Sequence, residues 1–404
     1  NATWFNQDIS SWDVSNGTNF SNMFSYAYVF NQDISNWDVS NGTNFSKMFY
    51  RASDFDQDIS SWDVSNGEDF SYMLSDASVF NQDLGNWDVS NGSDFEWMFS
   101  YAYKFNQDIS SWDVSNGTNF NSMFTATALN HDIGNWDVSN GTDFAYMFYK
   151  ATDFNQDIGD WDVSNGTDFK RMFALSSFNQ DIGDWDVSKG NDFSEMFTNA
   201  SDFNQHIGDW DVSNGEDFHS MFSAASDFNQ DIGNWDVSNG TDFRYMFSSA
   251  DSFDKDIGNW NVSNGTDFSY MFNGASLFDQ DISAWNASKG EFFTSMFTDA
   301  DLMLQAGWSE TPHSSDFLGE TTTGDATAET INGAAGNDIL SGFGGDDEIF
   351  GGNGWDKLFG GSGSDSLYGG SKDDTLTGGS GADILEGGSG SDTLYGGSSG
   401  DTLT

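Results

Sequence analysis

The sequence lacks cysteine and is poor in basic residues, and each shortage excludes a class of protein. Without cysteine, neither a disulfide scaffold nor a cysteine-ligated zinc site can form. Only 12 of the 404 residues are Lys or Arg, against 65 Asp or Glu, which gives a net charge of −53. So few cations cannot neutralise phosphates. We therefore expect neither nucleic acid nor an anionic lipid surface to be a partner.

Long apolar runs are missing as well. No stretch of about 18 apolar residues occurs, so we expect no membrane-spanning helix and no membrane insertion. No secretory signal peptide opens the sequence, so export is expected without a cleaved N-terminal signal. Phe, Trp and Tyr make up 17% of the residues, which is far too many for a disordered chain. The charge must therefore cover a folded chain with a large core, where it serves solubility or holds cations.

A first array of repeats fills residues 1–308. Tryptophan recurs there every 25 residues, with two spacings of 24, and marks twelve copies of one unit. A clean copy, residues 30–53, reads FNQDISNWDVSNGTNFSKMFYRAS. The marker residues are Trp12, Trp37, Trp62, Trp87, Trp112, Trp136, Trp161, Trp185, Trp210, Trp235, Trp260 and Trp285.

The composition changes after about residue 308. The last 96 residues hold 24 of the 45 Gly but only 4 of the 39 Phe. Residues 309–330, with Pro312 and many Thr, read as a connector. Residues 331–404 form a second array, in which Asp recurs every nine residues. Both arrays are acidic, with 48 acidic and 10 basic residues up to residue 308 and 17 and 2 beyond it.

Each 25-residue unit carries two periodic signals. Trp37 and Val39 alternate as in a short extended strand, and a turn signal follows at residues 41–42. Apolar residues then fall at i, i+3, i+4 and i+7, which predicts one face of a short helix: Phe45, Met48, Phe49 and Ala52. One such unit cannot bury its own apolar residues. Stacking it on its neighbours gives a continuous core.

The unit resembles a known repeat. The string I-x-x-W-x-V-x-x-G-T-x-F-x-x-M-F-x-x-A-x-x-F is similar to the 26-residue repeat of bacterial surface proteins, related to BspA-like leucine-rich repeats. The resemblance covers roughly residues 4–300 and implies a leucine-rich-repeat-like α/β solenoid of short parallel strands and short helices, found on microbial surfaces. The sequence departs from that family at Gly42 and Phe45, and it has Gly where leucine-rich repeats place a ladder asparagine. That ladder is therefore not expected here.

Two columns of aspartate should form when the units stack in register. Their carboxylates would lie about 5 Å apart and repel by about 1 kcal/mol per pair in water. Either backbone N–H groups cap them, or cations bind between them; the replacements His206, Asn261 and Asn286 favour capping. The first column is Asp8, Asp33, Asp58, Asp83, Asp108, Asp132, Asp157, Asp181, Asp231, Asp256 and Asp281, and the second is Asp13, Asp38, Asp63, Asp88, Asp113, Asp137, Asp162, Asp186, Asp211 and Asp236.

The second array matches G-G-x-G-x-D-x-U-x and is identified as a member of the RTX calcium-binding repeats. Calcium prefers six to eight hard oxygen ligands, which Asp and backbone carbonyls supply. The resemblance implies calcium-dependent folding and one-step export. The predicted Ca²⁺ ligands are Asp338, Asp347, Asp356, Asp365, Asp374, Asp383, Asp392 and Asp401, with Gly344, Gly354, Gly363, Gly381 and Gly390.

Two nonapeptides should form one coil of a parallel β-roll, so the eight units predict four coils. The apolar residue two positions after each Asp should fill a thin core. Lys372 replaces the third glycine of its unit, and Ser399 and Gly400 are shifted, so weaker sites are expected there. Without metal the carboxylates repel one another, and metal-binding energy becomes folding energy.

Nothing in the sequence indicates an enzyme. The four histidines, at positions 131, 206, 219 and 313, do not cluster in sequence. Neither H-E-x-x-H nor G-x-S-x-G occurs, and no EF-hand loop is present. The acidic residues recur in every unit, whereas a catalytic site is usually unique.

We therefore expect a secreted, calcium-stabilised structural or adhesive protein of the cell surface, acting as a rigid stalk or filament subunit. Because the sequence begins and ends inside repeats, we expect a segment of a longer chain or end-to-end self-association into filaments or a surface layer. The alternative is a glycan- or protein-binding surface protein that uses exposed aromatics: Tyr26, Tyr28, Trp97, Tyr101 and Tyr103. Clustering of these aromatics on one flank would favour the alternative. Ice binding is disfavoured because no Thr-x-Thr ladder runs through the array.

Overall fold

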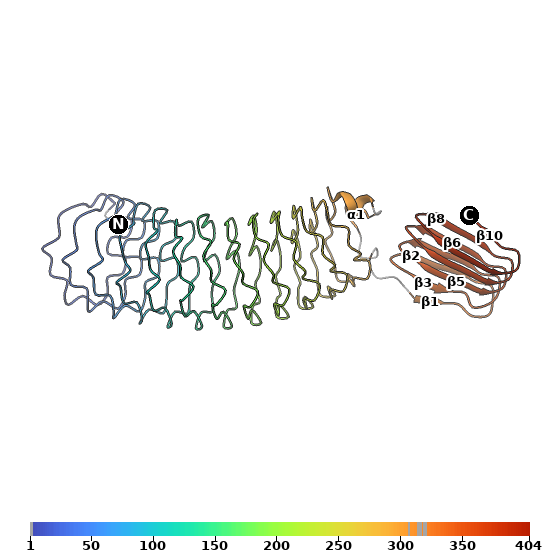
Figure 1. Ribbon diagram of the computed structural model, residues 1–404, viewed down its shortest axis with the longest axis horizontal. Helices are drawn as coiled ribbons and strands as arrows, with labels where there is room; N and C mark the ends of the chain where they lie inside the picture. Colours follow the sequence, from blue (N-terminus) through green and yellow to red (C-terminus); the bar gives the residue numbers. More distant parts are fainter. Residues whose placement is uncertain (1–2, 306–307, 313–316, 318–320) are drawn as a thin grey trace. The chain divides into compact units, whose positions relative to one another are not determined.

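The computed structural model describes residues 3–305, 308–312, 317 and 321–404. It divides into two compact units, one of Asn1–Trp235 with Tyr245–Phe253 and one of Asp236–Arg244 with Asp254–Thr404. The first unit consists of coils of the 25-residue repeat, and the second contains further coils and the strands β1 to β10 (Figure 1). Each unit is described separately.

The coils of the repeat are built from turns. Residues 3–300 contain no helix or extended strand; successive coils meet at isolated parallel bridges such as Asn44 with Asp69 and Asp69 with Asp94. The prediction of short helices and short strands in each repeat is therefore wrong, and with it the leucine-rich-repeat-like α/β arrangement. The only helix in the described residues is α1, Asp301–Gln305.

The expected helix fails because its N–H groups point in two directions. The N–H groups of Phe45, Lys47, Phe49 and Arg51 bond to carbonyls of the next coil at 2.8–2.9 Å. Those of residues 48, 50 and 52 bond to the carbonyl three residues earlier. Lys47 and Arg51 take φ of 57° and 60°, which places them in the left-handed region. The segment is a series of overlapping turns, because a helix would commit every N–H to its own segment.

The burial predicted from the apolar spacing is nevertheless confirmed. Phe45, Met48, Phe49 and Ala52 are all fully buried. Equivalent rings stack from coil to coil, as Phe45 and Phe70 do with centroids 5.6 Å apart. These columns of rings form the continuous core that a single unit could not provide.

Polar groups inside the coils also find partners one coil away. The indole Nε1 of Trp62 donates to the Ile34 carbonyl at 3.2 Å, and the other marker tryptophans repeat this bond. The Oδ1 of Asn31 accepts hydrogen bonds from the Asp56 backbone N–H at 3.0 Å and from Gln57 Nε2 at 2.8 Å. This bond repeats in the first unit from Asn6 to Asn204. An asparagine ladder is thus present, at the Asn-Gln-Asp segment and not at the position of leucine-rich repeats.

The second array forms a parallel β-roll. Its strands are β1 (Thr321–Thr323), β2 (Thr330–Ala335), β3 (Ile339–Ser341), β4 (Glu348–Asn353), β5 (Lys357–Ser362), β6 (Ser366–Ser371), β7 (Thr375–Ser380), β8 (Ile384–Ser389), β9 (Thr393–Ser398) and β10 (Thr402–Leu403). Odd strands pair in one five-stranded sheet and even strands in the other, all in parallel. β1 begins within the stretch predicted as a connector.

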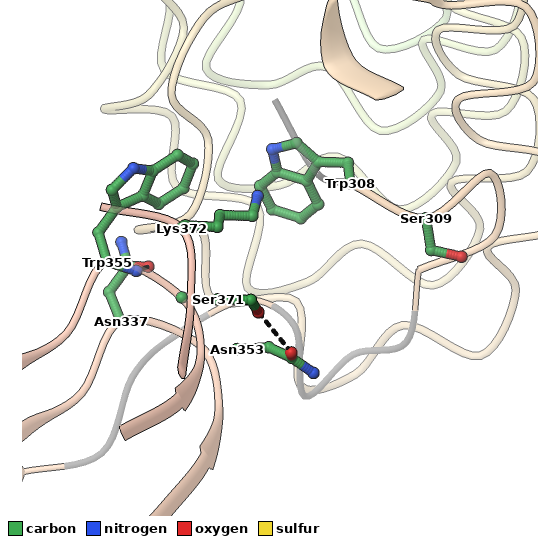
Figure 2. Close-up of a pocket in the computed structure, with 8 residues that line it drawn as sticks. Trp308, Ser309, Asn337, Asn353, Trp355, Ser371 and Lys372 are labelled. Carbon is green, nitrogen blue, oxygen red and sulfur yellow. Dashed lines mark hydrogen bonds between the residues drawn. The ribbon is translucent and has the colours of Figure 1, made fainter. Parts of the chain in front are cut away.

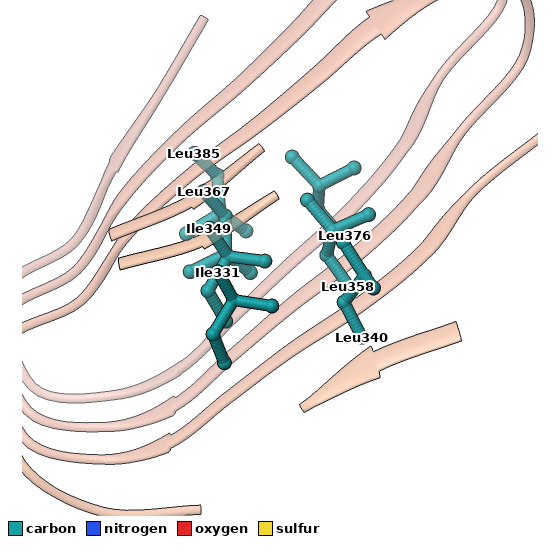
Figure 3. Close-up of a cluster of buried hydrophobic side chains, with 7 residues drawn as sticks. All are labelled: Ile331, Leu340, Ile349, Leu358, Leu367, Leu376 and Leu385. Atoms are coloured by element: carbon teal, nitrogen blue, oxygen red, sulfur yellow. The ribbon is translucent and has the colours of Figure 1, made fainter. Parts of the chain in front are cut away.

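The register of the roll confirms two nonapeptides per coil. Leu358 pairs with Leu376, and Leu367 with Leu385, so each residue stacks on the residue 18 positions later. One apolar residue from each strand points between the two sheets (Figure 3). The core residues are Ile331, Leu340, Ile349, Leu358, Leu367, Leu376 and Leu385. This core is only one side chain thick, so the stability of the roll must depend on more than apolar burial.

Candidate metal centre

The predicted aspartate ligands form two ladders in the turns between the sheets of the roll. Because adjacent strands belong to different sheets, alternate turns stack on one another with a period of 18 residues. One ladder contains Asp338, Asp356, Asp374 and Asp392, and the other contains Asp347, Asp365, Asp383 and Asp401. Along each ladder one carboxylate oxygen accepts the backbone N–H of the aspartate 18 residues earlier. Asp365 Oδ1, for example, accepts from Asp347 N at 2.9 Å.

The second carboxylate oxygen of each inner aspartate is buried without a protein partner. This holds for the Oδ2 atoms of Asp338, Asp347, Asp356, Asp365, Asp374 and Asp383, whose residues are at most 2% exposed. A buried oxygen that accepts no hydrogen bond costs free energy, and a buried charge costs more. These hard oxygen atoms are the donors that Ca²⁺ prefers. The residues present therefore fit calcium, which would satisfy the orphaned oxygens.

Burial also makes these carboxyls hard to ionise. It raises the pKa of Asp356 to about 6 and that of Asp374 to about 7, with smaller contributions from neighbouring ladder carboxylates. The pKa of Asp365 is raised for the same reason. At neutral pH the ladders thus hold carboxylates that are costly to keep charged, and a divalent cation offsets that cost.

Glycine is required beside the ladders at a position that the sequence reading missed. A Cβ on Gly360 would lie 2.4 Å from the Oδ2 of Asp365, five residues later, and Gly351 is pressed in the same way by Asp356. The first glycine of the nonapeptide therefore leaves room for the carboxylate. The signal was present in the sequence as a glycine in strict phase with each Asp.

The predicted glycine ligands occupy the turn two residues before each aspartate. Gly354, Gly363, Gly381 and Gly390 all have φ between 134° and 149° there. A Cβ on Gly363 would collide with the Gly345 carbonyl oxygen, so the carbonyls of successive turns follow one another along the stack. In the Asp347 turn Gly345 holds this position, with φ of 101°, and the predicted Gly344 lies one residue earlier.

Two residues without the glycine nevertheless adopt the same backbone. Lys372 and Ser399 have φ of 82° and 107°. The Lys372 side chain has partners outside the turn, because its Nζ lies 4.4 Å from the Trp308 ring centroid and 4.2 Å from the Trp355 centroid (Figure 2). Two cation–π contacts offset the strain of a left-handed lysine.

The two predicted aspartate columns of the repeats are capped by the backbone. Asp33 Oδ1 accepts the Ser35 N–H at 2.9 Å and the Ser35 hydroxyl at 2.7 Å, and these bonds lower the pKa of Asp33. Asp38 does the same with Ser40. The bond to the residue two positions later recurs along both columns, and Asn261 keeps it in place of Asp. Capping, the alternative favoured by the sequence variation, is therefore what the carboxylates do.

A third acidic column was missed by the sequence reading. It follows the bridges between coils and is half-buried: Asn19, Asn44, Asp69, Asp94, Asn119, Asp143, Asp168, Asp192 and Asp217 in the first unit. Burial raises the pKa of Asp168 to about 6, assisted by the neighbouring charges of Asp143 and Asp192. At Asp217 burial acts in the same direction, but hydrogen bonds from His219 lower the pKa overall.

The histidines do not form a common site in the described residues. His131 contacts the Asn106 carbonyl, and His206 contacts Asp209. His219 lies between Asp217 at 2.8 Å and Glu195 at 3.3 Å. His313 lies outside the described residues.

Comparison with known proteins gives two family matches. The model described as "Mycoplasma protein of unknown function, DUF285" matches residues 1–84, 38–128, 125–227 and 191–309. The model of the RTX calcium-binding nonapeptide repeat matches residues 323–358, 333–367, 350–385 and 368–403. No curated protein and no solved structure matches the chain. RTX nonapeptide repeats bind Ca²⁺, so the aspartate ladders are the calcium-binding part of the chain.

Replacing a ladder carboxylate should weaken calcium binding without disturbing the fold. Asp365→Asn keeps the Oδ1 acceptor for the Asp347 N–H but removes one charge and one hard oxygen donor. We expect calorimetric titration of the full chain to give roughly tenfold weaker Ca²⁺ binding at the affected turn. Glu386→Gln removes an exposed charge from β8 and should leave the titration unchanged. Equal affinities in the two variants would contradict the assignment.

The third column should make the repeats less stable as the pH rises. The folded pKa of Asp168, about 6, exceeds the usual unfolded value near 3.9, so its contribution to stability is complete below about pH 4 and is lost as the pH rises through 6. Asp168→Asn keeps the acceptor for the Lys170 N–H. Because solvent screens this half-exposed group, the variant should gain roughly 1 kcal/mol at pH 7.5 and nothing at pH 4.

Thermal unfolding at the two pH values checks this prediction. Asp162→Asn in the exposed column serves as the control, since Asp162 also accepts the N–H of the residue two positions later. A gain for Asp168→Asn that is the same at pH 4 and pH 7.5 would rule out the electrostatic explanation.

Proposed function

Because the chain belongs to the family described as "Mycoplasma protein of unknown function, DUF285" and continues into RTX repeats, we propose that it is a secreted, calcium-stabilised protein of the cell surface with a structural or adhesive role. Calcium converts the RTX roll from a strained array of carboxylates into a folded part of the chain. The stacked repeats then act as a rigid stalk or as a subunit of a filament.

The observation that carries this proposal is the row of orphaned oxygens in the roll. Six buried Oδ2 atoms without protein partners surround a core only one side chain thick. Apolar burial of this size cannot offset six buried charges. The roll should therefore fold where free calcium is abundant, as it is outside the cell, and stay unfolded where calcium is scarce.

Secretion agrees with the rest of the described chain. RTX repeats are typical of secreted proteins. In the residues that the structure covers, no helix is long and apolar enough to cross a membrane. The solvent-exposed aspartates of the repeats would remain soluble in a saline exterior, where salt screens their mutual repulsion.

A structural role is supported by how the repeats spend their polar groups. In the first unit, backbone N–H groups, indole N–H groups and asparagine side chains all bond from one coil to the next. Such a stack resists bending because each coil is fixed to both neighbours. We propose no enzymatic activity, since the acidic groups that recur in each coil serve as backbone caps.

A second candidate function is favoured by one observation. The exposed aromatics gather on one flank of the first unit, where Tyr26 contacts Tyr28 and Tyr50, and Trp97 contacts Tyr72 and Tyr101. Clustering of this kind is what a glycan- or protein-binding surface requires.

Hydrogen exchange of the full chain tests the main proposal. With millimolar Ca²⁺ the amides of β2 to β9 should exchange slowly, and an excess of chelator should speed their exchange by at least a hundredfold, because the roll unfolds. Residues 30–230 of the first unit should keep their protection in both conditions and serve as the internal control. If the roll is equally protected with and without calcium, the proposal fails.

A further inference from the structure

The turns of the first unit keep strained aromatic residues where glycine would fit. Each coil has two left-handed positions, and a non-glycine residue there costs about 1–2 kcal/mol. Gly274, in the second unit, holds one such position with φ of 73°. Tyr72, Trp97, Tyr101 and Tyr146 occupy them in the first unit, with φ of 57–59°. Strain of this kind persists at functional sites, which suggests that these side chains have a role.

The same positions vary from copy to copy while the rest of the repeat does not. The Trp-Asp-Val-Ser segment is nearly constant along the chain, whereas the residue before Met changes between Lys47, Tyr72, Trp97, Ser122 and Tyr146 in successive coils. Ten of the twelve tyrosines lie in these turns. Each coil thus contributes a different side chain to one surface, which is how a repeat protein builds a specific binding site.

One coil leaves a slot in this surface. It carries only the small residues Ser122 and Thr125 where its neighbours carry rings. Trp97 and Tyr101 form one wall, and Tyr146 and Tyr149 form the other, around a cavity of about 590 Å³. The Tyr72 ring stacks on Trp97 with centroids 5.5 Å apart and planes 6° from parallel, which supports the first wall from behind. Arg171 supports the second wall, with its guanidinium 5.4 Å from the Tyr146 centroid.

The width of the slot indicates the thickness of its ligand. Rings one coil apart lie 5.8 and 5.7 Å from each other at Phe95, Phe120 and Phe144, so walls two coils apart are separated by about 11 Å. A flat aromatic ligand stacked on both walls would need only about 7 Å, twice the contact distance between carbons. A saturated ring with C–H bonds on both faces is thicker and fits the wider slot.

The polar groups at the rim suit a hydroxylated ligand without charge. Glu96, Asn121 and Arg171 line the cavity together with the floor residues Ser122 and Thr125. They offer both hydrogen-bond donors and acceptors, and the Tyr72 hydroxyl already donates to Glu96 Oε1 at 3.2 Å. Arg171 is paired with Glu195 at 2.5 Å, so it brings no free positive charge. With a net charge of −53, the chain would repel an acidic ligand.

We propose that this slot binds a neutral pyranose ring of an oligosaccharide, held between Trp97 and Tyr146. The C–H faces of the sugar stack on the two walls, and its hydroxyls bond to the polar rim. The inference rests on the proposed function, because it gives the adhesive role of the surface protein a class of ligand. It assigns recognition to the repeats, while calcium acts on the roll.

Calorimetric titration of the full chain with cellohexaose, chitohexaose, laminarihexaose and mannohexaose tests the proposal. At least one should bind with a Kd below 1 mM, on the order expected for a shallow site. Trp97→Ala should weaken that binding at least tenfold. Ser122→Trp should do the same by filling the slot, although it removes no wall. Ser220→Trp is the matched control, because it places the same ring at a left-handed position in a distant coil and should leave binding unchanged.

Three results would overturn the proposal: no binding of any of the four sugars, equal binding by the Ser122→Trp and Ser220→Trp variants, or capture of a peptide in place of sugar by the slot. Hydrogen exchange of each variant excludes misfolding as the cause. The outcome is separable from that of the calcium test, since the slot lies within residues 72–171 and its sugar binding should survive chelation of calcium. Sugar binding with a calcium-insensitive roll would refute the proposed function alone.

Discussion

In-register stacking of identical units is the constraint on which this structure depends. It places every carboxylate about one coil step from its own copy, where a pair repels by about 1 kcal/mol in water and about 3.5 kcal/mol at an effective dielectric of 20. Each column must therefore satisfy its oxygens or expose them to water. The Asp33 and Asp38 columns do both, since the N–H two residues later caps one oxygen and the side chains are exposed. The roll satisfies only Oδ1 and buries Oδ2.

That difference links composition to function. The repeats are stable acidic coils that need no particular ion, because their core of stacked rings and their coil-to-coil hydrogen bonds are complete. The roll is incomplete by itself, and the missing part is a cation with a preference for hard oxygens. A calcium-rich exterior completes the roll. The variable turn side chains of the repeats, which stacking does not require, are left free for recognition.

The sequence predicted what depends on period and phase. Eight phased aspartates and glycines specified the roll, its two nonapeptides per coil and its leucine core, since a period of nine allows few other arrangements. The spacing of Phe45, Met48 and Phe49 correctly predicted burial but not a helix, because apolar spacing says nothing about where N–H groups bond. The asparagine ladder was overlooked because it depends on contacts between coils 25 residues apart. The half-buried Asp168 column was missed for the same reason, and Gly344 was chosen over Gly345 because two glycines adjoin in that turn.

The most direct test of the account is the position of calcium in crystals of the full chain grown in millimolar Ca²⁺, located by anomalous scattering. The account predicts calcium peaks about 2.3–2.6 Å from the Oδ2 atoms of the roll ladders, such as those of Asp356 and Asp365. It predicts no ordered ions along the Asp33 and Asp38 columns, whose carboxylates are capped. Ordered calcium along those columns, with none at the ladder Oδ2 atoms, would contradict it.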